Sequence, residues 1–198
     1  MKFYEYVLNF LIPGFNCVVV GNNNIGKTSL LMTYHQHKFP EDVNLIPTMF
    51  ERFISKITIE GKEIELQIID SNEEYEQNLK TISEAQVVII CFSLISPKSY
   101  NDVESRWLKI VKKEASGVPY ILVGTKSDLR DDFDNHRKEL EKKGFEPIST
   151  KKGHELKEKI GAVEYFECSA KLEINITNTF KYAARAAVEH KNSHCNVF

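Results

Sequence analysis

The sequence lacks three features that would place it in a specialised class of protein. No apolar stretch among its 198 residues is long enough to cross a bilayer. Acidic and basic residues nearly balance, giving a net charge of -2, so no global positive field favours nucleic acid as a partner. The four cysteines include no C-x-x-C pair, which argues against zinc and favours a reducing compartment. With 42% hydrophobic residues, the composition is that of one globular domain with a real core.

The start of the chain also lacks the marks of a targeting signal. Its apolar stretch is short, Asn9 interrupts it, and no small-residue cleavage site follows. Lys2 stands where N-myristoylation needs glycine. We therefore expect residues 1–14 to form an N-terminal extension that packs on the domain, with a membrane surface as the alternative.

The sequence does contain a phosphate-loop pattern. Residues 21–28 read Gly-Asn-Asn-Asn-Ile-Gly-Lys-Thr, which fits G-x-x-x-x-G-K-[ST]. A short apolar run precedes the pattern and a helical sequence follows it, as the motif requires. Backbone N–H groups and the helix N-terminus would hold phosphate, and Lys27 would reach the β and γ phosphates. Thr28 would offer its hydroxyl to Mg²⁺.

The interior of this loop is unusual. Asn22, Asn23 and Asn24 occupy places where small residues let phosphates lie close. Asparagine tolerates left-handed backbone geometry, so the loop can still form. We expect their side chains to project where a nucleotide or an attacking water needs room.

Apolar and helical segments alternate along the rest of the chain. The strands expected from this pattern are residues 15–20, 49–59, 62–69, 85–94, 120–124 and 165–168. The helices expected are residues 29–37, 97–114, 133–144, 154–160 and 174–191, whereas residues 71–80 read as irregular. This alternation predicts an α/β fold of the P-loop NTPase kind, with a mostly parallel doubly wound sheet flanked by helices. Ligand loops should lie at the carboxyl ends of the strands.

Two further motifs follow predicted strands. Residues 125–128, Thr-Lys-Ser-Asp, match the [N/T]-K-x-D guanine motif of small GTPases. The Asp128 carboxylate can accept hydrogen bonds from both the ring N–H and the exocyclic amine of guanine, and the Lys126 stem can lie along the base. Residues 169–171, Ser-Ala-Lys, match the loop whose backbone meets the guanine carbonyl. In this order and at these strand ends, the set is specific.

Longer stretches resemble the Rho family of small GTPases. They are residues 91–97 (CFSLISP), 124–132 (GTKSDLRDD) and 160–170 (IGAVEYFECSA). The resemblance covers nearly all of residues 15–198, and the charged segment 133–144 stands where Rho proteins carry an insert helix. It implies a monomeric GTP/GDP switch over residues 15–190 that uses Mg²⁺. Its partners would be cytoskeletal effectors, exchange factors and a GDP-dissociation inhibitor.

The resemblance also implies site residues. Those for the phosphates would be Asn23, Asn24, Ile25, Gly26, Lys27, Thr28, Ser29 and Thr48. Those for guanine would be Phe39, Thr125, Lys126, Asp128, Ser169, Ala170 and Lys171. Mg²⁺ would be held by Thr28, Thr48 and, through water, Asp70.

The last residues, 191–198, read as a tail that ends in a lipidation motif. Cys195-Asn196-Val197-Phe198 fits C-a-a-X, and a terminal Phe favours geranylgeranyl on Cys195. Lys191 is the only fixed positive charge just upstream. One lipid without a second signal holds membranes weakly. We therefore expect a cytoplasmic protein that is peripheral on membranes and partly cytosolic.

The sequence departs from the family where GTP is hydrolysed. The second switch of the family begins D-x-x-G-Q, but residues 70–74 read Asp-Ser-Asn-Glu-Glu. The glutamine that orients the attacking water is missing, and we assign no catalytic residue. Asn23 stands at a family glycine, and the first switch is lengthened before Ile46. We predict a small GTPase that binds nucleotide but hydrolyses it very slowly.

Two other functions remain open. One is an efficient phosphate-loop enzyme acting on a small phosphate acceptor, which would leave Asp128 and Ser169 unexplained. The other is an interaction module of GTPase ancestry with little use for nucleotide, which the three asparagines favour and the intact Lys27 and Thr28 oppose. Nucleotide selectivity separates these alternatives.

Overall fold

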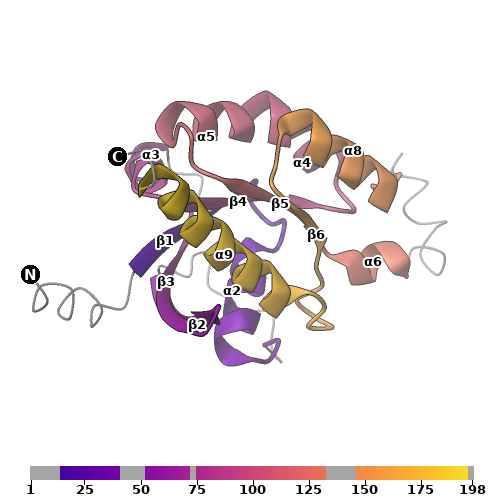
Figure 1. Ribbon diagram of the computed structural model, residues 1–198. Helices are drawn as coiled ribbons and strands as arrows, with labels where there is room; N and C mark the ends of the chain where they lie inside the picture. Colours follow the sequence, from indigo (N-terminus) through magenta and orange to yellow (C-terminus); the bar gives the residue numbers. More distant parts are fainter. Residues whose placement is uncertain (1–13, 41–51, 72–74, 133–145, 196–198) are drawn as a thin grey trace, which may run out of the picture.

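The fold is built on one six-stranded sheet. The computed structural model describes residues 14–40, 52–71, 75–132 and 146–195. The sheet order is β2-β3-β1-β4-β5-β6, as Figure 1 shows. The strands are β1 (Gly14–Val20), β2 (Arg52–Ile59), β3 (Lys62–Asp70), β4 (Val87–Ser93), β5 (Tyr120–Thr125) and β6 (Tyr165–Glu167). Among these described strands, the β2–β3 pairing is antiparallel and the other four pairings are parallel. The predicted mostly parallel α/β fold is confirmed.

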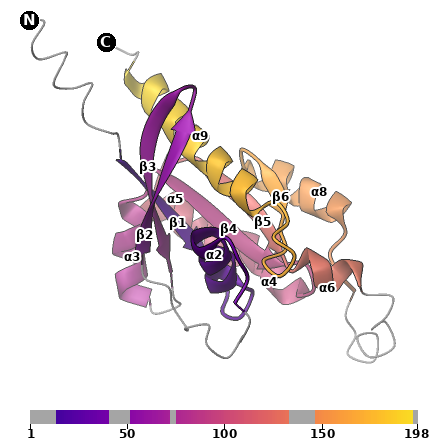
Figure 2. The ribbon, with the colours of Figure 1, turned by 90° about the horizontal axis from the view of Figure 1, so that it is seen from below.

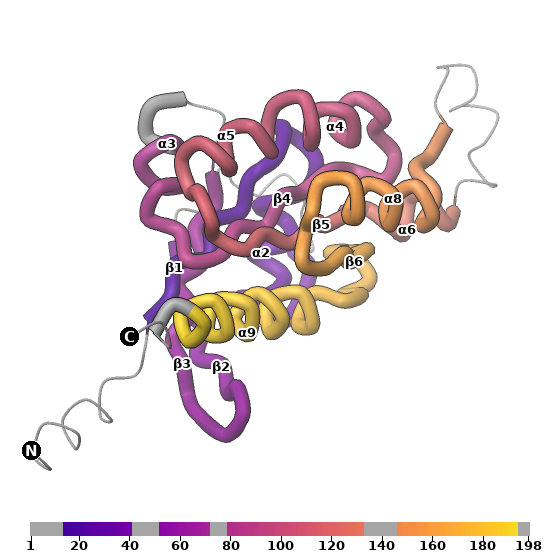
Figure 3. Tube along the Cα trace, turned by 45° about the horizontal axis from the view of Figure 1, so that its top comes forward, coloured from indigo at the N-terminus to yellow at the C-terminus, as the bar shows by residue number. Residues whose placement is uncertain are grey.

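Helical segments connect the strands and cover both faces of the sheet. They are α2 (Lys27–Gln36), α3 (Tyr75–Ser83), α4 (Pro97–Asp102), α5 (Leu108–Glu114), α6 (Ser127–Asp131), α8 (Thr150–Ile160) and α9 (Ile176–Cys195). A π-helical turn, Val103–Trp107, joins α4 to α5. Figure 3 shows α9 on one side of the sheet and α3, α4 and α5 on the other.

The layered arrangement follows from alternation along the central strands. In β1, Cys17 and Val19 pack in the core under α2 and α9, whereas Val18 and Val20 pack in the core under α3, α5 and α8. Every residue of β4 is buried. Strands covered on both faces need such continuous apolar runs, which is why the sequence made them easy to recognise.

The β2–β3 hairpin lies at the edge of the sheet. Glu60 and Gly61 both adopt positive φ, at 50° and 77°. A two-residue turn with this geometry matches the twist of the paired strands. Phe53 and Ile57 point into the core, whereas Ile54 is 57% exposed on the edge strand.

The structure corrects four points of the sequence prediction: two helices that were not expected and two helix boundaries. Residues 71–80 were expected to be irregular, but α3 occupies Tyr75–Ser83. The short helix α6 was not predicted. Helix α8 begins at Thr150 and not at residue 154, because Ser149 Oγ caps it by accepting from Lys152 N at 3.3 Å. Helix α9 continues to Cys195, into the segment expected to be a tail.

Several predicted features lie outside the described residues. They are residues 1–13 of the N-terminal extension, Thr48, residues 72–74 of the second switch, the expected insert helix at 133–144, and the last three residues of the lipidation motif. Gly14, expected in the extension, is the first residue of β1. Among the helices that are described, none combines the length and apolar character needed to span a membrane.

Candidate functional site

The phosphate loop lies between β1 and α2, at the carboxyl edge of the sheet. Gly21 approaches β4 so closely that a Cβ atom there would lie 2.5 Å from the Cys91 carbonyl oxygen, and its φ is +146°. Asn24 adopts the left-handed conformation, with φ 59°, as the asparagine content of the loop allows. The loop therefore adopts the geometry of a phosphate loop although asparagines occupy the interior positions where small residues are usual.

Lys27 is folded back onto the loop. Its Nζ donates to the carbonyl oxygens of Gly21 at 2.8 Å and Asn22 at 2.9 Å, and the residue is only 6% exposed. These bonds hold the ammonium against the first residues of the phosphate loop, beside the N-terminus of α2. A phosphate bound there would meet a fixed positive charge together with the helix dipole.

The side chain of Asn22 does not project toward bound nucleotide as expected. Asn22 Nδ2 donates to Asp102 Oδ2 at 2.6 Å, and Asn22 Oδ1 accepts from Trp107 Nε1 at 2.6 Å. Both partners belong to the stretch from α4 through the π-helical turn. The expectation was wrong for Asn22, because the end of α4 and the π-helical turn offer it two hydrogen-bonding partners. Asn23 and Asn24 are exposed.

Thr28 and Asp70 lie together beside the phosphate loop. Thr28 Oγ1 donates to Asp70 Oδ2 at 2.6 Å, although the two residues come from α2 and the end of β3. Hydroxyl and carboxylate oxygens are ligands that suit Mg²⁺, which keeps several of its waters. Within the described ranges, no group of three or more His, Cys, Asp or Glu residues gathers around a point. The pair fits Mg²⁺ that takes its remaining ligands from phosphate and water.

The guanine-motif residues are tied to the phosphate loop. Thr125 Oγ1 donates to the Ile25 carbonyl oxygen, and Lys126 Nζ donates to the Asn24 carbonyl oxygen at 2.8 Å. Burial lowers the pKa of Lys126, an effect that the nearby Asp128 carboxylate opposes. The two predicted halves of the site are therefore built as one unit.

The loop after β6 completes the base side of the site. Ser169 Oγ donates to Asp128 Oδ1 at 2.7 Å. Ser127 N donates to the Cys168 carbonyl oxygen at 3.1 Å, and Cys168 N donates to the Gly124 carbonyl oxygen at 2.8 Å. Two loops about 40 residues apart in sequence are thus held in register by one side-chain bond and two backbone bonds.

A pocket of about 170 Å³ lies between these loops and α2. It is lined by Gly26, Ser29, Leu30, Phe39, Thr125, Lys126, Asp128, Leu129, Ala170 and Lys171. All of these except Leu30 and Leu129 were predicted site residues. Leu129 could have been found as the residue that follows Asp128, and Leu30 as one helical turn from Gly26. A larger groove of about 530 Å³, between the α4–α5 stretch and α8, contains no predicted site residue.

The buried cysteines are not reactive groups of this site. Burial raises the pKa of Cys168 to about 12 and raises the pKa of Cys17 and Cys91 still further above the ordinary thiol value. All three are free thiols within the core. They act as small apolar side chains.

These observations define the class of protein. A phosphate loop follows β1, a hydroxyl–carboxylate pair lies beside it, and a base-sized pocket lies at the end of β5, near the point where the strand order reverses. This is the arrangement of a P-loop nucleotide-binding protein. The sequence model of the Ras family matches residues 16–189. The chain belongs to the Ras family of small GTPases, which bind GTP and GDP with Mg²⁺ and in general hydrolyse GTP.

Proposed function

We propose that this Ras-family protein is a Rho-like switch or scaffold that binds GTP or GDP, signals through effector binding, and hydrolyses GTP very slowly. The observation that carries the proposal is the pocket beside the phosphate loop. It gathers Phe39, Lys126, Asp128 and Ala170 from three separate parts of the chain. Asp128 would accept from guanine, Lys126 and Phe39 would cover the base, and the Ala170 backbone would meet its carbonyl.

On the phosphate side, Lys27 would exchange the two loop carbonyls for phosphate oxygens. Thr28 would contribute its hydroxyl to Mg²⁺, and Asp70 would hold the Mg²⁺ shell through water. Thr48, outside the described residues, would close on the same ion. The chemistry supplied by Mg²⁺ is neutralisation of phosphate charge.

Slow hydrolysis is proposed from the residues around the γ-phosphate position. The water-orienting glutamine is missing from residues 70–74, and Glu73 and Glu74 bring negative charge to that segment. Asn23 is an exposed residue of the phosphate loop at the position where a glycine would leave room. Both changes oppose the positioned water and the partner arginine that accelerate this reaction.

The Rho-like assignment rests on residues 91–97, 124–132 and 160–170. Effectors, exchange factors and a GDP-dissociation inhibitor are the partners that it favours. Geranylgeranyl on Cys195 would attach the protein to the cytoplasmic face of membranes, with part of it cytosolic.

The nucleotide that copurifies with the full chain tests the proposal. After denaturation of the purified protein, chromatography of the released nucleotide should give GTP or GDP in near-equal amount to protein. ATP or ADP in its place would contradict guanine selection and favour the phosphate-acceptor enzyme. A protein that carries no nucleotide and binds none on addition of GTP would be an interaction module.

A further inference from the structure

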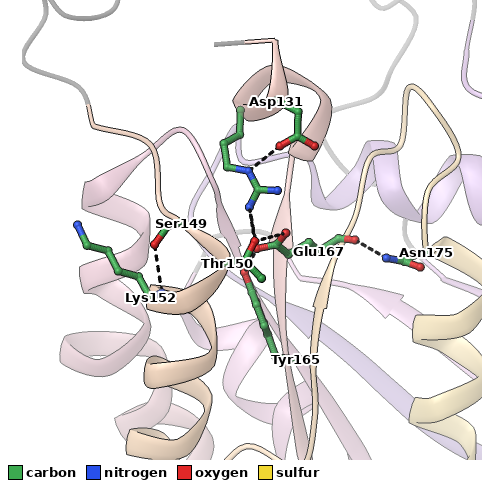
Figure 4. Close-up of polar contacts among 8 residues, drawn as sticks. Asp131, Ser149, Thr150, Lys152, Tyr165, Glu167 and Asn175 are labelled. Carbon is green, nitrogen blue, oxygen red and sulfur yellow. Dashed lines mark hydrogen bonds and ion pairs between the residues drawn. The ribbon is translucent and has the colours of Figure 1, made fainter. Parts of the chain in front are cut away.

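An ion pair outside the pocket joins the two loops that carry the guanine-motif residues. Arg130 Nη1 donates to Glu167 Oε1 at 2.7 Å, and both side chains are only 16% exposed. Tyr165 Oη donates to the same oxygen at 2.8 Å, and Thr150 Oγ1 donates to Glu167 Oε2 at 3.1 Å. Figure 4 shows these hydroxyls converging on the Glu167 carboxylate. The carboxylate is thus fixed by three donors from three elements, α6, α8 and β6.

The pair lies where it can control both loops. Arg130 belongs to α6, in the turn that begins with Ser127 and Asp128. Glu167 ends β6 and directly precedes Cys168 and Ser169. Its main-chain oxygen accepts from Asn175 Nδ2 at 2.9 Å, at the far end of the same loop (Figure 4). Glu167 therefore anchors both ends of the segment that carries Ser169.

None of the four side chains of this cluster lines the base pocket. Arg130, Thr150, Tyr165 and Glu167 can affect a bound base only through the loops. Tyr165 has little freedom of its own, since a Cβ atom on Gly153 would lie 2.2 Å from its Oη. The cluster lies behind the site and is partly buried, with Arg130 and Glu167 each 16% exposed. An ion pair of this kind is weak evidence for stability by itself, so a positioning role is tested separately.

We infer that the Arg130–Glu167 ion pair positions Asp128 and Ser169 and thereby sets the preference for guanine over a base without an exocyclic amine. This inference rests on the proposed function. The Asp128 carboxylate must meet two parallel donors of the base, and such bonds weaken steeply with poor direction. The Ser169–Asp128 bond transmits any shift of the loop after β6 to that carboxylate. Arg130 and Glu167 are positioning residues, because they touch the loops and not the base.

The test compares dissociation constants for GDP and IDP, the inosine analogue that lacks the exocyclic amine. They are measured for the full chain and for its Glu167→Gln variant, which keeps the side-chain shape and removes the charge. We expect GDP affinity to fall by about tenfold, the effect of misaligning one hydrogen bond to a charged group. IDP affinity should fall less. The GDP/IDP ratio is the decisive readout, because a loss of folded protein lowers both affinities equally.

Matched variants complete the experiment. Arg130→Lys keeps the charge and one hydrogen bond. Its GDP/IDP affinity ratio should lie between those of the wild type and of Glu167→Gln. Glu63→Gln breaks the exposed Lys56–Glu63 pair on the β2–β3 hairpin, 3.3 Å in length, and should leave the ratio unchanged. If Glu167→Gln fails to fold, the ratios of Arg130→Lys and Thr150→Val decide instead.

A wild-type GDP/IDP ratio in the Glu167→Gln variant, or in both substitutes for it, would overturn the inference and leave a merely structural ion pair. A wild-type protein without any preference for GDP over IDP would be a different failure. That result would overturn the proposed guanine site itself, and the positioning role with it.

Discussion

The Asp128 carboxylate has two oxygens, and Oδ1 accepts from Ser169 Oγ at 2.7 Å. In the proposed site both oxygens would also face the donors of guanine. Asp128→Asn removes this charge and one acceptor, and each charge-assisted bond contributes roughly 1.5–3 kcal/mol. GTP and GDP affinity should therefore fall about tenfold or more, with some gain for xanthine nucleotides.

Nucleotide titration of Asp128→Asn checks this, with Asp132→Asn as the matched control. Asp132 is exposed and does not line the pocket, so its variant should bind GDP as the wild type does. Unchanged GTP binding by Asp128→Asn would mean that the base does not occupy this pocket.

Glu167 makes a second prediction at the residue scale, on stability. Burial raises the pKa of its carboxyl, but bonds from Arg130, Tyr165 and Thr150 outweigh burial and bring the pKa below the ordinary 4.5. A carboxyl with a lowered pKa stabilises the folded state above its unfolded pKa, and this contribution is lost as pH falls. At neutral pH, the free energy of unfolding of the wild type should exceed that of Glu167→Gln by about 2 kcal/mol.

Urea unfolding at a series of pH values measures this difference. We expect it to be constant above pH 4.5, the ordinary carboxyl value, and to shrink as pH falls through the lower pKa of the folded state. The exposed Glu63 provides the comparison, because surface ion pairs contribute little at any pH. A difference that persists unchanged into strong acid would show that Glu167 acts by packing alone.

Two elements together determine hydrolysis, the phosphate loop and the segment after β3. A partner arginine and an orienting glutamine accelerate GTP hydrolysis by about 10⁵-fold in the best-studied case. Here the glutamine is missing from residues 70–74, and Asn23 occupies the loop. Single-turnover hydrolysis should be at or below the slow basal rate of small GTPases, and a Rho-directed activating protein should add little.

Asn23→Gly restores room without restoring the group that orients water, so it should recover little activity. A wild-type response like that of an ordinary Rho protein would contradict this prediction. Gln77, the nearest glutamine in the sequence and a residue of α3, would then be the first candidate for orienting the water.

At this scale the sequence identified most elements, and the exceptions have physical causes. Strands β1, β4 and β5 are buried on both faces, so their apolar runs were unmistakable. Helix α3 was missed because most of its residues are polar or charged and its apolar ones, such as Leu79 and the fully buried Ile82, are few. It packs against α5, and that tertiary contact stabilises a helix that local composition does not announce.

In the site too, features with a local sequence pattern were predicted, whereas those that depend on tertiary contacts were not. The motif residues Lys27, Thr28, Asp128 and Ser169 were found because their spacing is local. The contacts of Asn22 with Asp102 and Trp107, and of Arg130 with Glu167, join residues far apart in the chain. The π-helical turn that carries Trp107 is a single turn with i→i+5 hydrogen bonds inside a longer helical stretch. It is too short to give the sequence a periodicity of its own.

On the scale of the whole molecule, the start of β1 and the end of α9 lie away from the phosphate loop. Figure 2 shows β1 beginning and α9 ending at the same end of the molecule. Lys191 Nζ there lies 5.5 Å from the centroid of the Phe15 ring. The phosphate loop follows the other end of β1. A lipid on Cys195 would therefore hold the protein with its nucleotide site away from the bilayer.

Cys195→Ser should move the protein wholly into the soluble fraction of cells that can prenylate it. Fractionation with wild type as the control measures this change. A membrane pool that survives Cys195→Ser would contradict attachment by the lipid alone and would direct attention to the apolar residues between Phe3 and Ile12. Polar substitutions at Leu8 and Leu11 in the Cys195→Ser background would then test that stretch.

The hydrogen bond between Trp107 and Asn22 has an optical consequence. Trp107 is the only tryptophan in the chain, and its indole N–H contacts the phosphate loop at 2.6 Å. All tryptophan fluorescence of the protein therefore originates beside the first asparagine of that loop, in a residue only 2% exposed. A rearrangement of the loop on binding or losing nucleotide should change the emission, without any attached dye. In Asn22→Ala the indole N–H loses its acceptor. The emission of this variant should differ from that of the wild type before nucleotide is added, and it should change less when nucleotide binds.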